Sequence, residues 1–333
     1  MNDKTLMQIQ NLSVSFSIKR GVFSKPINLK AVDNISFNIM RGETLGLVGE
    51  SGSGKTTIGR AILNALNETR GDITYKTENE EIDISTLKGR ALRKFRRRMQ
   101  LIFQDPYTSL SPRMTVRDII AEPIEASGSS QGKEDTNQKV RDIAARCRLN
   151  VEHLRRFPHA FSGGQRQRIS IARSLVTNPE FVVCDESVAA LDVSIQADVL
   201  NLLKNLQNEL QLTYLFISHD LSVVAHISDR VAVLYLGKIV ELCSTHELFE
   251  KPMHPYTRAL FAAIPQIDVE KDPQAIKGEI PSPLNIPSGC RFHTRCPFAE
   301  EKCRSEEPEW RELNDGHHIA CHFAEKTESL PLE

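Results

Sequence analysis

The 333-residue sequence has almost no net charge, few aromatic residues and no long apolar run. Lysine and arginine together number 42 and aspartate and glutamate 43, so no global field attracts nucleic acid or an acidic surface. No apolar run approaches the roughly 18 residues that a membrane-spanning helix needs. The first ten residues, MNDKTLMQIQ, hold acid and amide side chains where a signal peptide has a basic start and an apolar stretch. We therefore expect a protein that works in the compartment where it is made.

What is present has the composition of a soluble globular protein. Hydrophobic residues make up 40% of the chain and charged residues 26%, which is enough apolar material for a buried core. The length corresponds to roughly two domains, and we see no internal repeat.

The seven cysteines are unevenly distributed. Cys147, Cys184 and Cys243 stand alone in helix-like or strand-like segments, and we interpret them as inert, semi-buried thiols. The other four fall within 32 residues near the end: Cys290, Cys296, Cys303 and Cys321. Because disulfides are rare in a reducing compartment, this group predicts a metal or cluster site.

The hydrophobic pattern predicts two kinds of strand. LMQIQNLSVSF (6–16) and NISFNIM (34–40) alternate apolar and polar residues, as half-buried antiparallel strands do. ETLGLVG (43–49) is a short apolar strand that runs into a glycine loop. EFVVCDE (180–186) and LTYLFISHD (212–220) end in polar residues, as buried parallel strands do. The pattern therefore favours an α/β fold with an additional antiparallel part.

The rest of the chain alternates helical and loop-like segments. Most of residues 105–179 have a helical pattern, interrupted by a polar loop, ASGSSQGKEDTNQK (126–139). VAVLYLGKIVEL (231–242) predicts a hairpin that turns at Gly237. Residues 265–287 are proline-rich and weakly periodic, which is typical of a connection to a separate tail.

Residues 49–56, GESGSGKT, match the phosphate-loop pattern G-x-x-x-x-G-K-[ST], with a strand before them and the helical segment KTTIGRAILNAL (55–66) after them. Glycines let backbone N–H groups converge on phosphate oxygens at a helix N-terminus. The Lys55 ammonium can reach the β and γ phosphates, and the Thr56 hydroxyl can bind Mg²⁺. A chance glycine-rich turn would not supply strand, loop and helix together. The residues predicted to bind ATP are Gly49, Ser51, Gly52, Ser53, Gly54, Lys55, Thr56 and Thr57.

Asp185 and Glu186 follow the apolar strand FVVC, at the edge of an α/β sheet where ligands bind. An acidic pair after a strand is often a helix cap, but beside a phosphate loop it predicts chemistry. We expect Asp185 to hold the magnesium ion, usually through water, and Glu186 to polarise the water that attacks the γ phosphate.

A second glycine loop, SGGQ (162–165), opens the helical segment RQRISIARSL (166–175). A serine followed by exposed glycine N–H groups at a helix start forms either an anion site or a plain N-cap. The stretch alone leaves both open, because one nucleotide needs only one cradle.

The order of these motifs resembles that of the ATP-binding cassette family, over roughly residues 5–250. After the phosphate loop come Gln104 in LIFQD, then FSGGQ, VVCDE and ALD, and finally His219 in ISHD. The resemblance implies a P-loop NTPase core of the RecA-like α/β type, with an antiparallel β subdomain and a helical signature subdomain at about residues 105–179. It also implies that two cassettes dock head to tail, so that the signature loop of one closes on the γ phosphate held by the other. The signature residues that would serve the partner's ATP are Ser162, Gly163, Gly164 and Gln165.

The resemblance assigns further roles to single residues. It implies that Gln104 senses magnesium, the attacking water and the membrane partner. It implies that His219 hydrogen-bonds the γ phosphate, that Phe16 stacks on adenine, and that the D-loop residues Ala189 and Asp192 pass signals across the dimer.

Two positions depart from the family pattern. Ser187 stands where the family often has proline, and Ala189 stands where it often has serine. The missing hydroxyl at Ala189 removes one possible hydrogen bond across the dimer, while both acidic residues before it remain intact.

Three further features are similar to the ATPase subunits of oligopeptide and dipeptide importers. They are the long first hairpin (17–37), QDPYTSLSPRMTV (104–116) and HPYTRAL (254–260). With the cysteine-bearing tail, this likeness covers essentially all 333 residues. It implies an ATPase domain over residues 1–264 and a C-terminal extension over residues 265–333.

This likeness also implies partners and a location. The partners would be a second ABC ATPase subunit, either a paralogue or an identical copy, two transmembrane permease subunits and, indirectly, an extracytoplasmic solute-binding protein. The subunit would lie peripherally on the cytoplasmic face of the cell membrane. Importers of nickel, glutathione and some oligosaccharides share this ATPase type, so the cargo stays open. The segment GRALRKFRRRMQ (89–100) has six basic residues and is interpreted as a solvated face. The alternatives are contact with anionic lipid headgroups or with nucleic acid, and the neutral overall charge disfavours nucleic acid.

Other classes fit the sequence less well. Cassette ATPases of DNA repair or translation split or duplicate the cassette, whereas here the phosphate loop and the signature each occur once, about 110 residues apart. An exporter ATPase is disfavoured by the tail, and a non-enzymatic sensor by the intact Lys55, Glu186 and His219. We expect no nucleic-acid partner.

The cysteine tail has the spacing C-x5-C-x6-C-x17-C, without the tight C-x2-4-C pair that begins most zinc sites. Four thiolates at this spacing suit a [4Fe–4S] cluster, and the resembled importers carry one in this tail. Zinc and four idle thiols are the alternatives. The nearby histidines are interpreted as solvated: His293, His317, His318 and His322.

Overall fold

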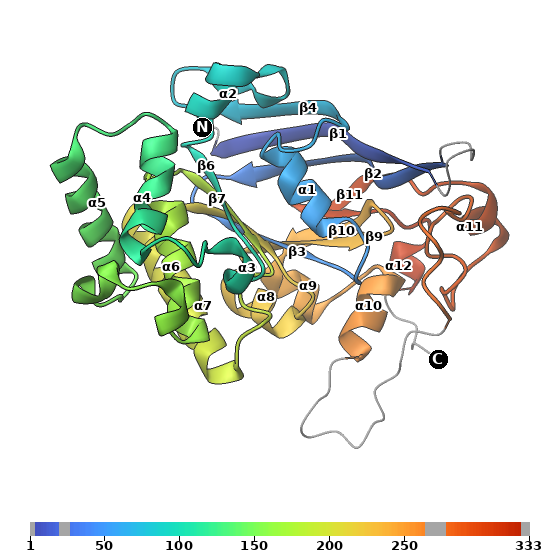
Figure 1. The fold of residues 1–333 in the computed structure, drawn as a ribbon. Helices are drawn as coiled ribbons and strands as arrows, with labels where there is room; N and C mark the ends of the chain where they lie inside the picture. The colour runs from blue at the N-terminus through green and yellow to red at the C-terminus, as the bar shows by residue number, and fades with distance from the viewer. Residues whose placement is uncertain (1–3, 20–26, 264–277, 328–333) are drawn as a thin grey trace. The chain divides into compact units, whose positions relative to one another are not determined.

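The structure is a computed structural model that describes residues 4–19, 27–263 and 278–327 (Figure 1). The chain folds into two compact units. Unit 1 comprises Met1–Met7, Asn38–Thr44 and Thr74–Ser218. Unit 2 comprises Gln8–Phe37, Leu45–Ile73 and His219–Glu333. Within the described ranges, no helix combines the length and the apolar character needed to cross a bilayer.

Unit 1 contains three parallel strands in the order β6-β7-β8. Their bounds are Met99–Ile102 for β6, Phe181–Asp185 for β7 and Thr213–Ile217 for β8. Phe181 pairs with Met99 on one side and with Thr213 on the other. All residues of β7 and β8 are buried, as the apolar runs predicted. Because the strands are parallel, their carboxyl ends lie at one edge, where Asp185 ends β7.

The helices of unit 1 follow the predicted helical segment and lie together in Figure 1. α4 packs against both α5 and α6, and α3 packs against α6. The bounds are α3 (Pro106–Ser109), α4 (Val116–Ala126), α5 (Lys133–Arg146), α6 (Gly163–Leu175) and α7 (Val193–Leu210), with short 3₁₀ turns at Val151–Arg155 and Pro158–Ala160. The helical pattern predicted over residues 105–179 is therefore confirmed.

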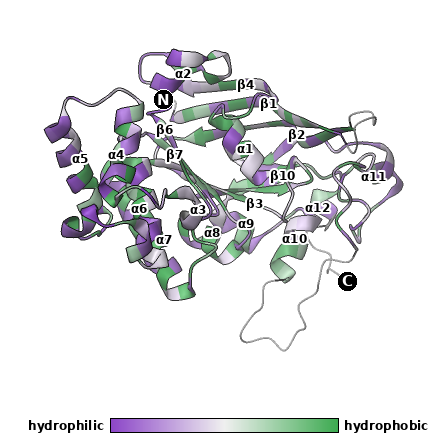
Figure 2. Cartoon of the chain, viewed as in Figure 1, coloured by the Kyte–Doolittle hydropathy of each residue, from purple (hydrophilic) through white to green (hydrophobic). Residues whose placement is uncertain are grey.

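The polar loop predicted over residues 126–139 is wrong in its second half, because α5 already begins at Lys133. The buried stripe of α5 consists of Thr136, Val140, Ile143 and Ala144. Thr136, the first residue of this stripe, is polar. The apolar residues with helical spacing therefore begin only at Val140, and the sequence pattern gave no sign of the first turns of α5. Figure 2 shows the outer face of this helix as hydrophilic.

The basic segment predicted as a solvated face forms α2 (Gly89–Phe95), after the short β5 (Glu81–Asp83) and a 3₁₀ turn at Ile84–Thr86. Arg90, Arg93 and Lys94 are exposed. Phe95 anchors the helix, since its ring lies edge-on to Tyr75 at 5.1 Å between ring centroids. The solvated interpretation therefore holds for these basic side chains.

In unit 2, β3 (Thr44–Val48) pairs in parallel with β9 (Arg230–Tyr235), and β9 turns at Gly237 into the antiparallel β10 (Lys238–Ser244). Gly237 has a φ of +81°, a conformation that glycine adopts without strain. The predicted hairpin is confirmed. The helices of this unit are α1 (Lys55–Ile62), α8 (Leu221–Ile227), α9 (Thr245–Glu250) and α10 (Pro255–Ala262).

The predicted antiparallel strands are β1 (Thr5–Ile18) and β2 (Ile27–Met40), and β4 (Thr69–Lys76) joins them in the order β2-β1-β4. Leu12 and Val14 are buried at every second position of β1, as the alternation predicted. The tip of the long first hairpin, residues 20–26, lies outside the described residues.

The C-terminal extension continues the sheet of unit 2. β12 (His317–Ile319) pairs antiparallel with β10, placing Ile319 opposite Glu241, and β11 (Arg311–Asn314) pairs with β12. Two short helices complete it, α11 (Glu301–Ser305) and α12 (Ala324–Thr327). Residues 264–277 of the predicted proline-rich connection lie outside the described residues.

Candidate functional site

The phosphate loop of unit 2 joins β3 to α1 and depends on two glycines with positive φ. Gly49 has a φ of +151°, and a Cβ atom there would lie 2.1 Å from the carbonyl oxygen of Leu234. Gly54 has a φ of +108°, and its Cβ would lie 2.4 Å from the carbonyl oxygen of Ala31. Since both obstacles are backbone atoms, no side chain fits at either position. Backbone carbonyl groups of the same unit therefore pack directly against the phosphate loop at both glycines.

Lys55 lies folded over this loop. Its side chain is buried, and Nζ donates to the carbonyl oxygens of Gly49 at 2.6 Å and Glu50 at 3.0 Å. The Ser53 hydroxyl is buried and has no hydrogen-bond partner among the described residues. Thr56 lies half-buried in the first turn of α1, beside Lys55. An orphaned hydroxyl and a cation at a helix N-terminus suit a phosphate group.

The other ATP-contacting residues expected in unit 2 are more open. Ser51 and Gly52 are exposed, and Thr57 is half-buried. Phe16 is half-buried near the end of β1, and His219 is exposed shortly before α8.

In unit 1, the structure brings Gln104 and Glu186 together. Nε2 of Gln104 donates to Oε2 of Glu186 at 2.6 Å, across 82 residues of sequence. Glu186 has a φ of +47°, which a side-chain-bearing residue adopts only at a cost, and its N–H donates to the carbonyl of Ile217 at 3.0 Å. Such backbone strain is concentrated at functional sites. The contact therefore joins the carboxylate that follows β7 to the side chain of Gln104.

The residues around Glu186 differ in exposure. Asp185 is buried at the end of β7, and Ser187 is buried with a hydroxyl that has no hydrogen-bond partner among the described residues. Ala189 and Asp192 are exposed, and the next residue, Val193, is 83% exposed at the start of α7.

The signature loop forms a capping box at the start of α6. The hydroxyl of Ser162 accepts from the N–H of Gln165 at 3.4 Å, and the N–H of Ser162 donates to Oε1 of Gln165 at 3.0 Å. Gly164 is buried, and a Cβ there would lie 2.6 Å from Cγ2 of Ile195. Gly163 has nothing within 3.4 Å of such an atom. The loop is therefore an N-cap, and its role as an anion site stays a prediction.

A cation–π contact connects the signature helix with the segment after Gln104. The guanidinium of Arg166 lies 4.4 Å from the ring centroid of Tyr107. Arg166 also donates to the carbonyls of Pro158 and Phe161. The cation–π contact therefore packs the start of α6 against the segment that follows Gln104.

The four tail cysteines line one cavity in unit 2, together with Phe292, Phe298 and Phe323. Burial raises the pKa of three of the thiols, to about 11 for Cys290 and about 12 for Cys296 and Cys321. The fourth cysteine of the cavity is Cys303. Within the described ranges, no three of the four cysteine sulfurs all lie within 4.8 Å of one another. A tetrahedral zinc with Zn–S bonds of about 2.3 Å would bring its sulfurs closer than that.

One group of potential ligand atoms was not identified from the sequence: Cys243, Glu247 and His317, whose ligand atoms lie within 4.8 Å of one another. His317 was expected to be solvated, and this is wrong, because it is 3% exposed and its Nε2 lies 2.9 Å from Oε1 of Glu241. The buried carboxylate of Glu241 also accepts from the N–H groups of Met253 and His254. The need of Glu241 for donors accounts for the position of His317.

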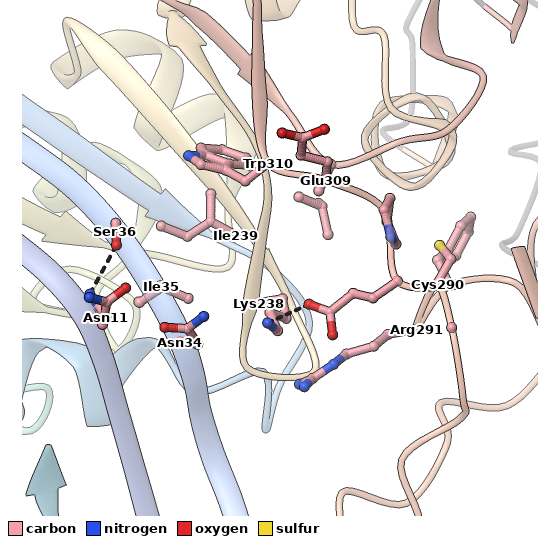
Figure 3. Close-up of a pocket in the computed structure, with 16 residues that line it drawn as sticks. Asn11, Asn34, Ile35, Ser36, Lys238, Ile239, Cys290, Arg291, Glu309 and Trp310 are labelled. Atoms are coloured by element: carbon pink, nitrogen blue, oxygen red, sulfur yellow. Dashed lines mark hydrogen bonds and ion pairs between the residues drawn. The ribbon is translucent and has the colours of Figure 1, made fainter. Parts of the chain in front are cut away.

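A separate cavity of about 370 Å³ lies in unit 2 (Figure 3). Residues of β1 and β2 form one wall, with Asn11 donating its N–H to the hydroxyl of Ser36. The hairpin residue Lys238 and the extension residues Arg291 and Trp310 form the other side. None of the predicted nucleotide-binding residues lines it.

Sequence comparison identifies two families in this chain. The ABC transporter family matches residues 32–189, and the C-terminal region of oligopeptide/dipeptide transporters matches residues 240–303. The chain is 49% identical over 97% of its length to the oligopeptide transport ATP-binding protein AppF of Bacillus subtilis (strain 168), and the match covers 98% of that protein. It is 44% identical over 96% of its length to the oligopeptide transport ATP-binding protein OppF of Haemophilus influenzae (strain ATCC 51907 / DSM 11121 / KW20 / Rd), and the match covers 97% of that protein.

Solved structures give the same result for the fold. The dimeric ATP-binding cassette MJ0796, in a post-hydrolysis state bound to ADP and phosphate, matches with a TM-score of 0.61 and 26% identity. The match covers 72% of this chain and 98% of that one. The ABC transporter component cbiO1 of Clostridium perfringens matches with a TM-score of 0.62, over 74% of this chain and 92% of that one. The chain therefore belongs to the ATP-binding proteins of the oligopeptide type within the ABC transporter family, and it is an ABC-type ATPase.

Proposed function

We propose that this chain hydrolyses ATP to power an ABC importer of dipeptides or oligopeptides. The observation that carries the proposal is 49% identity over 97% of the chain to a protein named for oligopeptide transport. The match of residues 240–303 to the C-terminal region of such transporters supports the same cargo class. An importer of nickel, glutathione or oligosaccharide is the alternative, since the permease and the binding protein select the cargo.

In the proposed mechanism, ATP occupies the phosphate loop. Lys55 exchanges its bonds to the Gly49 and Glu50 carbonyls for bonds to the β and γ phosphates. Thr56, Asp185 and Gln104 are the residues that would hold Mg²⁺, which when bound neutralises charge on the phosphates. The orphaned hydroxyl of Ser53 gains a phosphate oxygen as its partner.

Glu186 is the proposed general base. It takes a proton from water as that water attacks the γ phosphate, while the amide of Gln104 holds the carboxylate in place at 2.6 Å. His219 is proposed to hydrogen-bond the γ phosphate, and Phe16 to stack on adenine. Catalysis then consists mainly of positioning and charge stabilisation.

A second cassette, a paralogue or an identical copy, is proposed to complete the site. The exposure of Ser162 and Gln165 at the start of α6 and of Val193 at the start of α7 supports this role, because it leaves these positions accessible to a partner. Gly164, which is buried against Ile195, supports the loop by close packing and serves the partner's ATP through its backbone. Ala189 and Asp192 are proposed to lie at the same interface.

Two permease subunits at the cytoplasmic face of the membrane are the proposed partners of the segment after Gln104, and an extracytoplasmic binding protein would deliver the cargo to them. Phe103, Tyr107 and Phe157 support this docking surface, since all three are more than 40% exposed in unit 1.

We also propose that the chain divides into an ATPase domain (1–264) and a C-terminal extension (265–333).

We propose a [4Fe–4S] cluster held by the four cysteines of the tail. All four cysteines line one small cavity, and no three of their sulfurs all lie within 4.8 Å of one another, which supports a shared site other than a single tetrahedral zinc. When bound, the cluster supplies cross-links between distant parts of the extension, and its role here is structural. Anaerobically purified protein without iron and without broad visible absorbance would contradict this proposal, and one zinc per chain would support the alternative.

The test of the main proposal is Glu186→Gln in the full-length chain. We expect MgATP binding to persist while phosphate release falls by roughly 100-fold or more, because the general base is lost. Glu209→Gln, which removes an exposed carboxylate of α7, is the matched control and should hydrolyse at the wild-type rate. Normal turnover by Glu186→Gln would show that another group takes the proton.

A further inference from the structure

The extension reaches back to the phosphate loop through one buried arginine. Nη1 and Nη2 of Arg295 donate to the two carboxylate oxygens of Glu50, at 2.8 and 3.1 Å. The Arg295 side chain is 4% exposed and that of Glu50 is 22% exposed. Glu50 is the second residue of the phosphate loop, and Arg295 directly precedes Cys296. A bidentate ion pair within unit 2 thus joins two segments that are 245 residues apart in sequence.

Aromatic side chains enclose this ion pair. The Arg295 guanidinium lies 5.8 Å from the ring centroid of Tyr235 and 6.0 Å from that of Phe292. The hydroxyl of Tyr256 accepts from the N–H of Glu50 at 3.0 Å. Water is therefore largely excluded, and a bidentate pair in such surroundings is both stronger and more rigid than an exposed one.

A second arginine of the same segment braces the structure behind the loop. Arg291 donates to the carbonyl of Leu236 and to the carboxylate of Asp33, and Figure 3 shows it directly beside Cys290. The N–H of Gly237 in turn donates to the carbonyl of Ser53 at 2.8 Å. The segment from Cys290 to Cys296 thus supports the phosphate loop at two points.

The charge of Glu50 gives the ion pair a consequence for nucleotide binding. A carboxylate in a phosphate loop repels a triphosphate, and the repulsion is large where water is excluded. A guanidinium that takes both oxygens neutralises this charge and holds the carboxylate away from the cradle. The carbonyl of Glu50, which accepts from Lys55, is fixed by the same contact.

We propose that Arg295 is a positioning residue for ATP binding: it neutralises and fixes Glu50, so that the C-terminal extension sets the affinity of the phosphate loop. This inference rests on the proposed function, because it assumes that the loop binds MgATP. It assigns to the extension a role in nucleotide binding that is separate from any role in holding a cluster.

The test measures the affinity for MgATP in the full-length chain by titration with a fluorescent ATP analogue. Arg295→Met keeps the length of the side chain and removes its charge, and we expect Kd to rise about tenfold or more while kcat at saturating ATP stays within about threefold. Glu50→Gln combined with Arg295→Met should recover most of the lost affinity, because no charge is then left unpaired. Arg304→Met, which removes an exposed arginine of the same extension, should leave Kd unchanged.

Each outcome decides between alternatives. Wild-type Kd in Arg295→Met would overturn the proposal, and a raised Kd that Glu50→Gln does not rescue would overturn the charge argument and leave only a structural role. If Arg295→Met does not fold, Arg295→Gln decides: it keeps hydrogen-bond donors but removes the positive charge, so a raised Kd supports the proposal and an unchanged one refutes it. A wild-type chain that binds no MgATP would instead refute the proposed function.

Discussion

The two glycine loops of this chain both precede a helix, yet they are built in opposite ways. The phosphate loop is fixed from behind, because backbone carbonyls close on Gly49 and Gly54 and Arg295 holds Glu50. The signature loop is held by its own capping box, by the packing of Gly164 and by the contacts of Arg166, and its residues Ser162 and Gln165 are exposed. A loop that binds the chain's own nucleotide can be shaped in advance by its own unit. The role proposed for the signature loop, binding a partner's nucleotide, requires an exposed binding face.

The largest difference between the loops should appear when a methyl group is added to each. In Gly54→Ala the new Cβ meets the carbonyl oxygen of Ala31, and the backbone is strained at a φ of +108°. At about 1–3 kcal/mol of strain, MgATP affinity should fall roughly 10- to 100-fold. The measurement is a titration of the full-length chain with MgATP.

Gly163→Ala is the matched variant in the other loop. The added methyl meets only ordinary contacts, with the Tyr107 hydroxyl at 3.5 Å and Cδ2 of Leu191 at 3.9 Å, so the fold and the binding of ATP by the same chain should persist, while hydrolysis that depends on the proposed partner falls. Equal loss of affinity in the two variants would contradict the distinction between a fixed loop and an open one.

The support behind the phosphate loop should also respond to pH. His254 caps α10, which places Tyr256 on Glu50, and burial lowers the pKa of His254 to about 4 from its ordinary 6.5. Between these two values the unfolded chain binds the extra proton and the folded chain does not, so stability falls as the pH falls through this window. From pH 7 to pH 5 the loss should be about 2 kcal/mol.

Urea unfolding of the wild type at both pH values measures this loss. His254→Asn keeps a capping side chain without a titrating group, and it should lose about 2 kcal/mol less over the same interval. If the free energy of unfolding changes equally with pH in the two proteins, His254 is not the cause of the loss.

The smallest effect should come from the capping box of the signature loop. Ser162→Ala removes the acceptor for the N–H of Gln165, which should lower the free energy of unfolding by about 1 kcal/mol. Urea unfolding measures this directly, and Ser222→Ala in α8, whose N–H but not its hydroxyl serves the cap at Asp220, is the control. A much larger loss would mean that the signature loop is as firmly built as the phosphate loop.

Local patterns predicted much of this fold. The apolar runs before Gly49, at Phe181–Asp185 and at Thr213–Ile217 form the predicted strands, since a short run bounded by turn signals has few alternatives. The phosphate loop is predictable from the spacing of its glycines and lysine together with the strand before it and the helix after it, because its chemistry needs these residues at fixed positions. The roles of Gln104 and the signature loop came instead from the family resemblance.

Contacts between residues far apart in sequence could not be predicted. Nothing in the local pattern connects Arg295 with Glu50, or His317 with Glu241, because burial of each partner depends on tertiary packing. The positive φ of Glu186 was equally invisible, since glutamate rarely adopts that conformation. The start of α5 was missed because Thr136 takes a buried position that an apolar residue usually fills.

The ion pair between Arg295 and Glu50 also affects the design of hybrid subunits, in which the cassette of one protein is joined to the tail of another. A graft that joins this cassette to a foreign tail would leave an acidic side chain without its counterion in the middle of the triphosphate cradle. Any working hybrid has to bring a cation of its own to that spot or replace Glu50 at the same time. The C-terminal extension and the phosphate loop should therefore be exchanged together, wherever the domain boundary between them is placed.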